Sequence, residues 1–371
     1  MHAAAPSDGY RQYWLYAGLP LLACAAVLAS QSTGVALARF ERIVSFFGDP
    51  AFIAIGETFL PYSPEDSIAY AILVGMANSI GVTIAGIVLS TVLGTLIAFG
   101  ILSSSTPLSL ICRTYVLVIR SVPLLVQLLL LYALTQYLPQ LRNAASIGDA
   151  VLISNRGIII PSVTVEGWAW LLICAGMAAA MLGRRLLHLA VLRERMPRAA
   201  AWAPIAILVV TFGISIVLGV SVEVPVRAGF GYRGGFSLSP EMASLIFGLT
   251  IYFAAYIAEI VRGGIIAVPR GQWEGAASLG LPKLHTTLFV ITPQAVRLIL
   301  PPLISQFLNQ FKASTLAIAI GFPDLSSIVN ALISRTGQAL LLVLVMMLIY
   351  SAISLLISFS VQRLEARLRR Y

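Results

Sequence analysis

The chain has 371 residues, of which 59% are hydrophobic and 11% are charged, and its formal net charge is +9. Its mean hydropathy is +0.93, whereas a soluble domain carries about 25% charged residues. This composition excludes a soluble globular protein and predicts a polytopic membrane protein. Because backbone polar groups in lipid must be satisfied within each segment, we expect an all-α fold.

Eight apolar windows approach the length that a membrane crossing requires. They lie at 14–29, 69–102, 123–138, 167–182, 201–220, 243–267, 296–320 and 339–360. The second window exceeds the roughly 20 residues that a bilayer needs, so it is expected to tilt, protrude or break. The sequence therefore predicts about eight transmembrane helices.

Basic residues indicate the orientation, because Lys and Arg concentrate in cytoplasmic loops. With both termini in the cytoplasm, 16 of the 24 basic residues fall in cytoplasmic segments, including the loops 184–198 and 268–295. The opposite side receives the acidic segment 39–66, which contains Glu41, Asp49, Glu57, Glu65 and Asp66. We therefore predict that both termini are cytoplasmic.

Three other features of the sequence are interpreted as those of a membrane protein. Basic residues that alternate with apolar ones, as in RRLLHLAVLRERMPR (184–198), suit a lipid surface rather than nucleic acid. The N-terminus resembles a signal peptide with ALA at 36–38 as a cleavage site, but a retained first helix fits the charge pattern better. Cys24, Cys112 and Cys174 are widely spaced, which favours packing roles over a disulfide framework or a metal site.

Motifs of self-contained enzymes are missing from the sequence. It has no GxxxxGK[ST] phosphate loop, no HExxH and no GxSxG, and its three histidines are far apart. A membrane protein without a nucleotide site uses an ion gradient, conducts passively, or depends on a separate ATPase. We expect no cofactor in this chain.

The stretch RGQWEGAASLGLPKLHTT (270–287) looks like a piece of soluble helix between two apolar windows. Trp273, Ala276, Ala277 and Gly280 recur at i, i+3, i+4 and i+7, which predicts one helix face made largely of small residues. Gly280 suits the left-handed residue that ends a helix, and Pro282 suits the first turn of the next. Two interpretations follow: a docking face for a partner, or an interfacial helix that caps the bundle.

This stretch resembles the EAA motif of the membrane subunits of ATP-binding-cassette (ABC) importers. The matching positions are Glu274, Gly275, Ala276, Gly280, Val290 and Pro293. The sequence departs from the usual motif at Gly275, where alanine is more frequent, and at Thr292, where leucine is. The resemblance implies a coupling helix that docks in a cleft of the ATPase subunit.

Flanking motifs are similar to those of polar amino acid permeases of the histidine and glutamine importer type. They are RSVPLLVQL (120–128), YIAEIVRGGIIAVPRGQ (256–272) and ITPQAVRLILPPL (291–303). Further stretches, including NRGIIIPS, GGFSLSPE and LAIAIGFPDL, resemble the long permease subunits of general L-amino-acid importers. RSVP replaces the more frequent RNTP, and QFKAST replaces KNSS or KDTS, so the substrate range stays open.

The resemblance implies a type I ABC importer transmembrane domain in a bacterial inner membrane. The expected organisation is 1–68 for a transmembrane helix and periplasmic segment, 69–362 for the transmembrane domain, and 363–371 for a cytoplasmic tail. An inserted helix pair is expected at about 164–221. The implied partners are a second permease subunit, two ATPase subunits that bind the ATP, and a periplasmic amino-acid-binding protein.

Two functional alternatives stay open. A secondary transporter would show internal repeats with broken helices in matching halves, and the sequence has no convincing repeat. Within the family, the alternative is a narrower importer for glutamate, aspartate, glutamine or basic amino acids. A membrane scaffold would need neither a docking loop nor charges within its spans.

Polar residues within the predicted spans are candidates for a translocation path, because charges inside a membrane generally face a polar cavity or a partner. They are Glu259, Asn309, Lys312 and Ser314. A zwitterionic substrate needs opposite charges for its ammonium and carboxylate groups. The alternative is that Glu259 pairs with Arg262 to hold helices together and that Lys312 snorkels outward.

Overall fold

The computed structural model describes residues 33–148, 150–165, 172, 174–180, 208–211, 213, 220–228 and 231–368. These residues form two compact units. One combines the chain up to Leu134 with the chain from Glu241 onward, and the other is Thr135–Pro240. The predicted span 14–29 and the loop 184–198 lie outside the described residues, and the spans 167–182 and 201–220 are described only in part.

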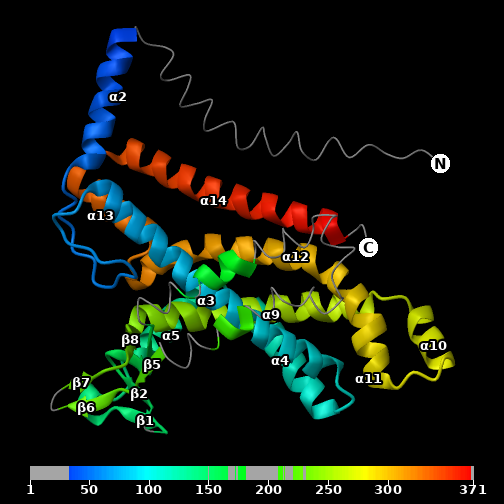
Figure 1. Ribbon diagram of the computed structural model, residues 1–371. Helices are drawn as coiled ribbons and strands as arrows, with labels where there is room; N and C mark the ends of the chain where they lie inside the picture. The colour runs from blue at the N-terminus through cyan, green and yellow to red at the C-terminus, as the bar shows by residue number, and fades with distance from the viewer. Residues whose placement is uncertain are drawn as a thin grey trace. The chain divides into compact units, whose positions relative to one another are not determined.

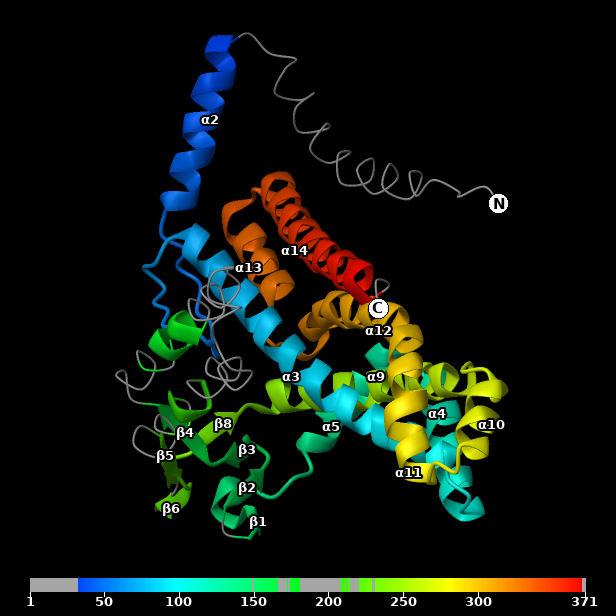
Figure 2. The ribbon, with the colours of Figure 1, turned by 45° about the vertical axis from the view of Figure 1, so that its right-hand side comes forward.

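The first unit is helical (Figures 1 and 2). Its elements are α2 (Thr33–Gly48), α3 (Ile68–Leu102), α4 (Thr106–Ser121), α5 (Leu124–Thr135), α9 (Pro240–Ile266), α10 (Arg270–Ser278), α11 (Lys283–His285), η3 (Thr286–Ile291), α12 (Thr292–Ala313), η4 (Ser314–Ile320), α13 (Leu325–Thr336) and α14 (Ala339–Leu368). Among the described residues, four helical segments are long and apolar enough to cross a membrane: Ile68–Leu102, Pro240–Ile266, Lys283–Ile320 and Ala339–Phe359. Each overlaps a predicted span, because a continuous apolar run of about 20 residues is what a membrane crossing requires.

The third predicted span, 123–138, needs correction. The helix α5 has only 12 residues, which is about 18 Å and too short to cross a bilayer alone. It forms a bent pair with α4, and the two helices meet at an angle of 102°. Gln127 caps the break, because its amide nitrogen donates to the carbonyl oxygens of Ile119 at 2.8 Å and Val122 at 2.9 Å. Counted together, this pair raises the described candidate spans from four to five.

Close helix crossings in the first unit depend on glycine. A Cβ at Gly94 of α3 would lie 2.8 Å from the carbonyl oxygen of Ala254 in α9. A Cβ at Gly75 would lie 3.0 Å from the Cα of Leu325 in α13, which packs along α3. Small residues at crossings are typical of membrane helix packing, because they let two backbones approach.

The helix that follows α10 is longer than the predicted span 296–320. It runs from Lys283 to Ile320 and includes a π-helical segment (η3) and a final 3₁₀ segment (η4). Pro301 and Pro302 lie inside α12 without ending it. The second half of the predicted cytoplasmic loop 268–295 is therefore helical.

The second unit contains strands that the sequence analysis did not predict. A four-stranded antiparallel sheet has the order β1-β2-β3-β8, with β1 at Ala145–Ile147, β2 at Val151–Ser154, β3 at Gly157–Ile160 and β8 at Phe236–Leu238. The strands β4 (Ser162–Val165) and β5 (Val220–Glu223) pair with each other, as do β6 (Val226–Ala228) and β7 (Gly231–Arg233). A short 3₁₀ turn, η1 (Leu141–Asn143), precedes them. The predicted insertion at about 164–221 is thus the middle of a larger unit, Thr135–Pro240.

Candidate functional site

The EAA-like stretch folds as one short helix, α10, and a turn, whereas the second predicted short helix, α11, is the first turn of the continuous helix Lys283–Ile320 (Figure 2). Gly280 has φ +71°, the left-handed conformation expected of it. Its N–H donates to the carbonyl oxygen of Ala277 at 2.9 Å, and the N–H of Leu281 donates to that of Ala276 at 3.1 Å. These two bonds form a Schellman motif that ends α10. Pro282 follows as the residue directly before α11.

The residues of the predicted small-residue face differ in their exposure. Ala276 is buried, with 4% of its surface exposed, so it packs against the chain itself. Glu274, Gly275, Ala277 and Gly280 are exposed. A Cβ built on Gly275 or Gly280 would meet no atom within 4 Å. The surface open to a partner therefore includes Glu274, these small residues and Leu279, whereas Ala276 anchors α10.

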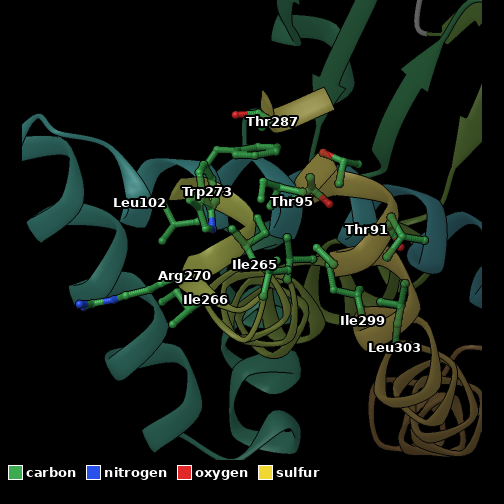
Figure 3. Close-up of a pocket in the computed structure, with 17 residues that line it drawn as sticks. Thr91, Thr95, Leu102, Ile265, Ile266, Arg270, Trp273, Thr287, Ile299 and Leu303 are labelled. Atoms are coloured by element: carbon green, nitrogen blue, oxygen red, sulfur yellow. The ribbon is translucent and has the colours of Figure 1, made fainter. Parts of the chain in front are cut away.

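Trp273 also faces the chain's own helices (Figure 3). It lines an apolar cavity of about 750 Å³ together with residues of α3, α9, η3 and α12, including Leu102, Ile265 and Ile299. Arg270 lies at the edge of this cavity, and its side chain extends away from the other labelled side chains (Figure 3). Gln294 of α12 donates to Gln272 of α10 at 3.0 Å. These contacts attach α10 to the start of α12, where Pro293 lies exposed in the first turn.

Glu259 lines a second pocket, of about 490 Å³, between α4 and α9. Its carboxylate accepts a hydrogen bond from Arg262 Nε at 3.0 Å and pairs with the Nη2 atom of the same arginine. This is the ion pair that the alternative interpretation predicted. The pocket is also lined by Arg113, Arg120 and Tyr256. Glu259 thus lies among three arginines.

Two helix faces meet at this pocket. Arg113 and Arg120 are seven residues apart on α4, so they lie on one face of that helix. Tyr256 and Glu259 are three residues apart on α9, so they also lie on one face of their helix. The guanidinium carbon of Arg120 lies 5.0 Å from the centre of the Tyr256 ring, which is cation–π geometry.

Asn309, Lys312 and Ser314 do not line this pocket. Asn309 and Lys312 are exposed at the end of α12. Ser314 is fully buried, and its hydroxyl donates to the carbonyl oxygen of Phe311 at 2.8 Å. Within this chain, therefore, the four residues predicted for the translocation path do not line a common pocket.

Arg113, Arg120 and Tyr256 are pocket residues that the sequence analysis did not select. Arg120 entered it as the first residue of the RSVPLLVQL motif, and both arginines were among the basic residues counted for orientation. Their seven-residue spacing was the available signal, because two charges on one face of a predominantly apolar helix indicate a polar neighbour. The tyrosine gave no signal of its own.

Comparison with known proteins shows the family. Residues 86–370 match the family described as "Binding-protein-dependent transport system inner membrane component". The General L-amino acid transport system permease protein AapQ of Rhizobium johnstonii is 35% identical over 352 residues, covering 91% of this chain and 87% of that protein.

Two further relatives are similar over most of their length. The Putative amino-acid ABC transporter permease protein YhdX of Escherichia coli is 36% identical over 334 residues, covering 85% of this chain and 82% of that protein. The Glutamate/glutamine/aspartate/asparagine transport system permease protein BztB of Rhodobacter capsulatus is 36% identical over 352 residues, with the same two shares. The predicted fold, that of a type I ABC transporter permease, is confirmed, and the chain belongs to the family of binding-protein-dependent transport system inner membrane components.

Proposed function

We propose that this chain is a permease subunit of an ATP-driven importer that moves amino acids, with a broad range of L-amino acids as substrates. The observation that carries the proposal is the exposed small-residue surface of α10, which lies between two candidate spans and carries the EAA-like residues. The printed names of AapQ, YhdX and BztB support amino acids as the substrate class.

The partners in this proposal follow from the family. A second permease subunit completes the transmembrane pair, two ATPase subunits bind ATP and dock on α10, and a periplasmic binding protein delivers the amino acid. The complex resides in a bacterial inner membrane with both termini of this chain in the cytoplasm. ATP binding closes the ATPase pair, and α10 transmits the movement so that the permease pair alternates between two states.

The coupling residues in this proposal are Glu274, Gly275, Ala276, Gly280 and Pro293. Exposed Glu274, Gly275 and Gly280 contact the ATPase cleft, and Ala276 holds α10 on its own bundle. Because Gln294 bonds to Gln272, a displacement of α10 is passed to the start of α12. The helix α12 then moves the polar residues at its far end.

The translocation path in this proposal includes Glu259, Asn309, Lys312 and Ser314. The exposed positions of Asn309 and Lys312 on a helix of membrane-spanning length favour a polar neighbour, which a second permease subunit supplies. Glu259 contributes from its own pocket on α9. The path thus runs between two subunits rather than through this chain alone.

A narrower importer for acidic amino acids and their amides is the second candidate. The printed name of BztB, a relative at 36% identity, favours it. The two candidates differ only in the set of amino acids that the complex accepts.

One experiment tests the proposal. The chain is co-expressed with the permease, ATPase and binding-protein genes that neighbour its own, purified through a tag on this chain, and reconstituted in liposomes with ATP enclosed. We expect the four components to co-purify and labelled amino acids to accumulate only with ATP and the binding protein. Accumulation driven by an ion gradient without ATP would instead indicate a secondary transporter.

A further inference from the structure

We propose that the pocket between α4 and α9 binds the carboxylate groups of the transported amino acid and selects against cationic side chains. The residues that carry this selection are Arg113, Arg120 and Arg262, with Tyr256 and Glu259 beside them. The inference rests on the proposed function and extends it from a class of substrate to a charge preference within that class.

The charges of the pocket are unbalanced. Three guanidinium groups and one carboxylate line it, which is a net charge of +2. Glu259 is already paired with Arg262. Among the residues that the structure describes, neither Arg113 nor Arg120 has a carboxylate within 4 Å. The pocket therefore lacks anions rather than cations.

Both unpaired arginines are held in place. Arg120 stacks on the Tyr256 ring, and Arg113 Nε donates to the hydroxyl of Ser109 at 3.2 Å. Tyr115 of α4 donates to the carbonyl oxygen of Ile251 in α9 at 2.6 Å, which fixes the two helices beside the pocket. Among the described residues, no hydrogen bond or ion pair occupies the terminal guanidinium nitrogens of either arginine. Positioned guanidinium groups suit carboxylates, because they offer parallel N–H donors to two oxygens.

The helix α4 is apolar around most of its circumference. It exposes Ile111 and Val118 on the side away from the arginines, and the exposed Leu117, which also lines the pocket, lies between Arg113 and Arg120. Such a helix lies in lipid or against another subunit, where an unpaired arginine is costly unless it faces a polar cavity or a ligand. The break between α4 and α5 begins at Val122, two residues after Arg120. Broken helices at membrane depth are tolerated where they line a cavity.

The volume and charge define the ligand. A pocket of about 490 Å³ lies within the range of roughly 300–1,000 Å³ in which small ligands bind. The α-carboxylate of any amino acid supplies one anion, and glutamate or aspartate supplies a second. A lysine or arginine substrate brings an added cation close to three guanidinium groups, which repel it. The expected order of preference is acidic, then neutral, then cationic amino acids.

The test measures uptake ratios in proteoliposomes that contain the complete complex, its own binding protein and enclosed ATP. Labelled glutamate, leucine and arginine are compared for the wild type, Arg113→Gln and Arg120→Gln. Because the binding protein is the same throughout, its own preference cancels when the ratios are compared between variants. We expect each variant to lower glutamate uptake relative to leucine at least threefold. Arginine uptake relative to leucine is expected to rise wherever the binding protein delivers arginine.

Controls separate charge selection from folding. Arg297→Gln removes an exposed arginine of α12 outside the pocket and is expected to leave both ratios unchanged. Arg120→Lys keeps the charge and is expected to restore most of the preference. If Arg120→Gln fails to assemble, Arg113→Gln decides, because Arg113 is exposed and makes no ring contact among the described residues.

Two results would overturn the inference. Ratios that match those of the wild type in both glutamine variants would remove the pocket from substrate selection. Proportional loss of all three substrates that depends on the content of anionic lipid in the liposome would identify a lipid headgroup as the ligand. Absence of any ATP-dependent amino acid uptake by the wild type would contradict the proposed function itself, which keeps the two failures distinct.

Discussion

The side-chain amide nitrogen of Asn78 lies 2.9 Å from the carbonyl oxygen of Pro323, a residue 245 positions further along the chain. The same amide nitrogen donates to the carbonyl oxygen of Glu57, and the Asn78 carbonyl accepts from the backbone N–H of Phe59. Asn78 is only 1% exposed. One buried side chain on α3 therefore ties the segment before α3 to the segment before α13.

We expect Asn78→Leu to destabilise the fold strongly. It leaves three part-buried backbone groups, of Glu57, Phe59 and Pro323, without this hydrogen-bond partner, and a fully buried group of this kind costs about 1–3 kcal/mol. The measurement is the thermal midpoint of the purified subunit in detergent. Asn330→Leu is the matched control, because Asn330 is exposed and its side chain donates only to Ser326 among the described contacts. Equal midpoints for the two variants would contradict the role given to Asn78.

The buried carboxyl group of Asp324 leads us to predict that the stability of the subunit depends on pH. Asp324 begins α13, between two candidate spans, and its Oδ1 atom accepts from the N–H of Ser327 at 2.8 Å. Burial raises the pKa of Asp324 from 3.8 to about 7, against the lowering effect of hydrogen bonds from Ser327 and Ser326. Between these values the unfolded chain loses its proton while the folded chain keeps it. The contribution of Asp324 to stability is therefore greatest below pH 4, falls by about 1.4 kcal/mol per pH unit as pH rises toward 7, and levels off above it.

The variant Asp324→Asn isolates this contribution. Asparagine keeps an acceptor for the N–H of Ser327 and does not ionise, so the difference in stability between variant and wild type is expected to grow from pH 4 to pH 7. The measurement is the thermal midpoint in detergent across that range. Asp49→Asn, at an exposed position, is the control and should follow the wild type. A variant with the same pH slope as the wild type would show that Asp324 does not titrate as stated.

Some of this architecture follows from sequence because one physical requirement dominates it. Lipid demands long apolar helices, so the windows 69–102, 243–267 and 339–360 agree with α3, α9 and the membrane-length part of α14 to within a few residues. The left-handed Gly280 was also predictable, since few other residues end a helix at low cost. The break at Val122 was not, because 123–138 is a predominantly apolar window and a bend leaves its hydropathy unchanged.

The strands and the charged pocket escaped prediction for different reasons. Ile158, Ile159 and Ile160 form a continuous apolar run in β3, which lacks the alternation that reveals a half-exposed strand. The pocket depends on α4 and α9 meeting face to face, with about 140 residues between Arg120 and Arg262. A single sequence gives the charge of each residue but not the helix that it will face.

Coupling through α10 is tested at Gly275. A Cβ there meets no atom within 4 Å and the backbone is not left-handed, so Gly275→Arg alters the exposed surface without straining the backbone. We expect the subunit to stay in the membrane while ATP-dependent uptake falls at least tenfold. Glu274→Lys, which reverses the one charge of this surface, is expected to act in the same way.

Gly280→Arg is also expected to uncouple ATP hydrolysis from transport. This variant needs a control of its own. Its backbone has φ +71°, a conformation that costs other residues about 1–2 kcal/mol. Gly280→Ala measures that strain without the bulk. If Gly275→Arg shows normal uptake, α10 is not a docking surface; if the protein is lost from the membrane, α10 serves to cap the bundle.

Topology is tested with single cysteines in a cysteine-free background. Ser278→Cys on exposed α10 is expected to react only with reagents that reach the cytoplasm, whereas Ser63→Cys, in the acidic segment before α3, reacts from outside. A cysteine at position 190, outside the described residues, is expected to behave like the one at 278. Labelling of position 190 from outside would contradict eight spans with both termini in the cytoplasm.

Lys312 provides the test of the translocation path. It is exposed near the end of α12, within the membrane-length helix Lys283–Ile320, where a cation needs a polar neighbour or must snorkel to the interface. If it lines the path between two permease subunits, Lys312→Met should leave the complex assembled and lower uptake of all amino acids in a panel. The proportional loss distinguishes it from Arg120→Gln, which changes the ratios between substrates. Lys312→Arg keeps the charge and should retain most of the uptake. Unchanged uptake in Lys312→Met would place the side chain outward, as a snorkelling residue with no part in the path.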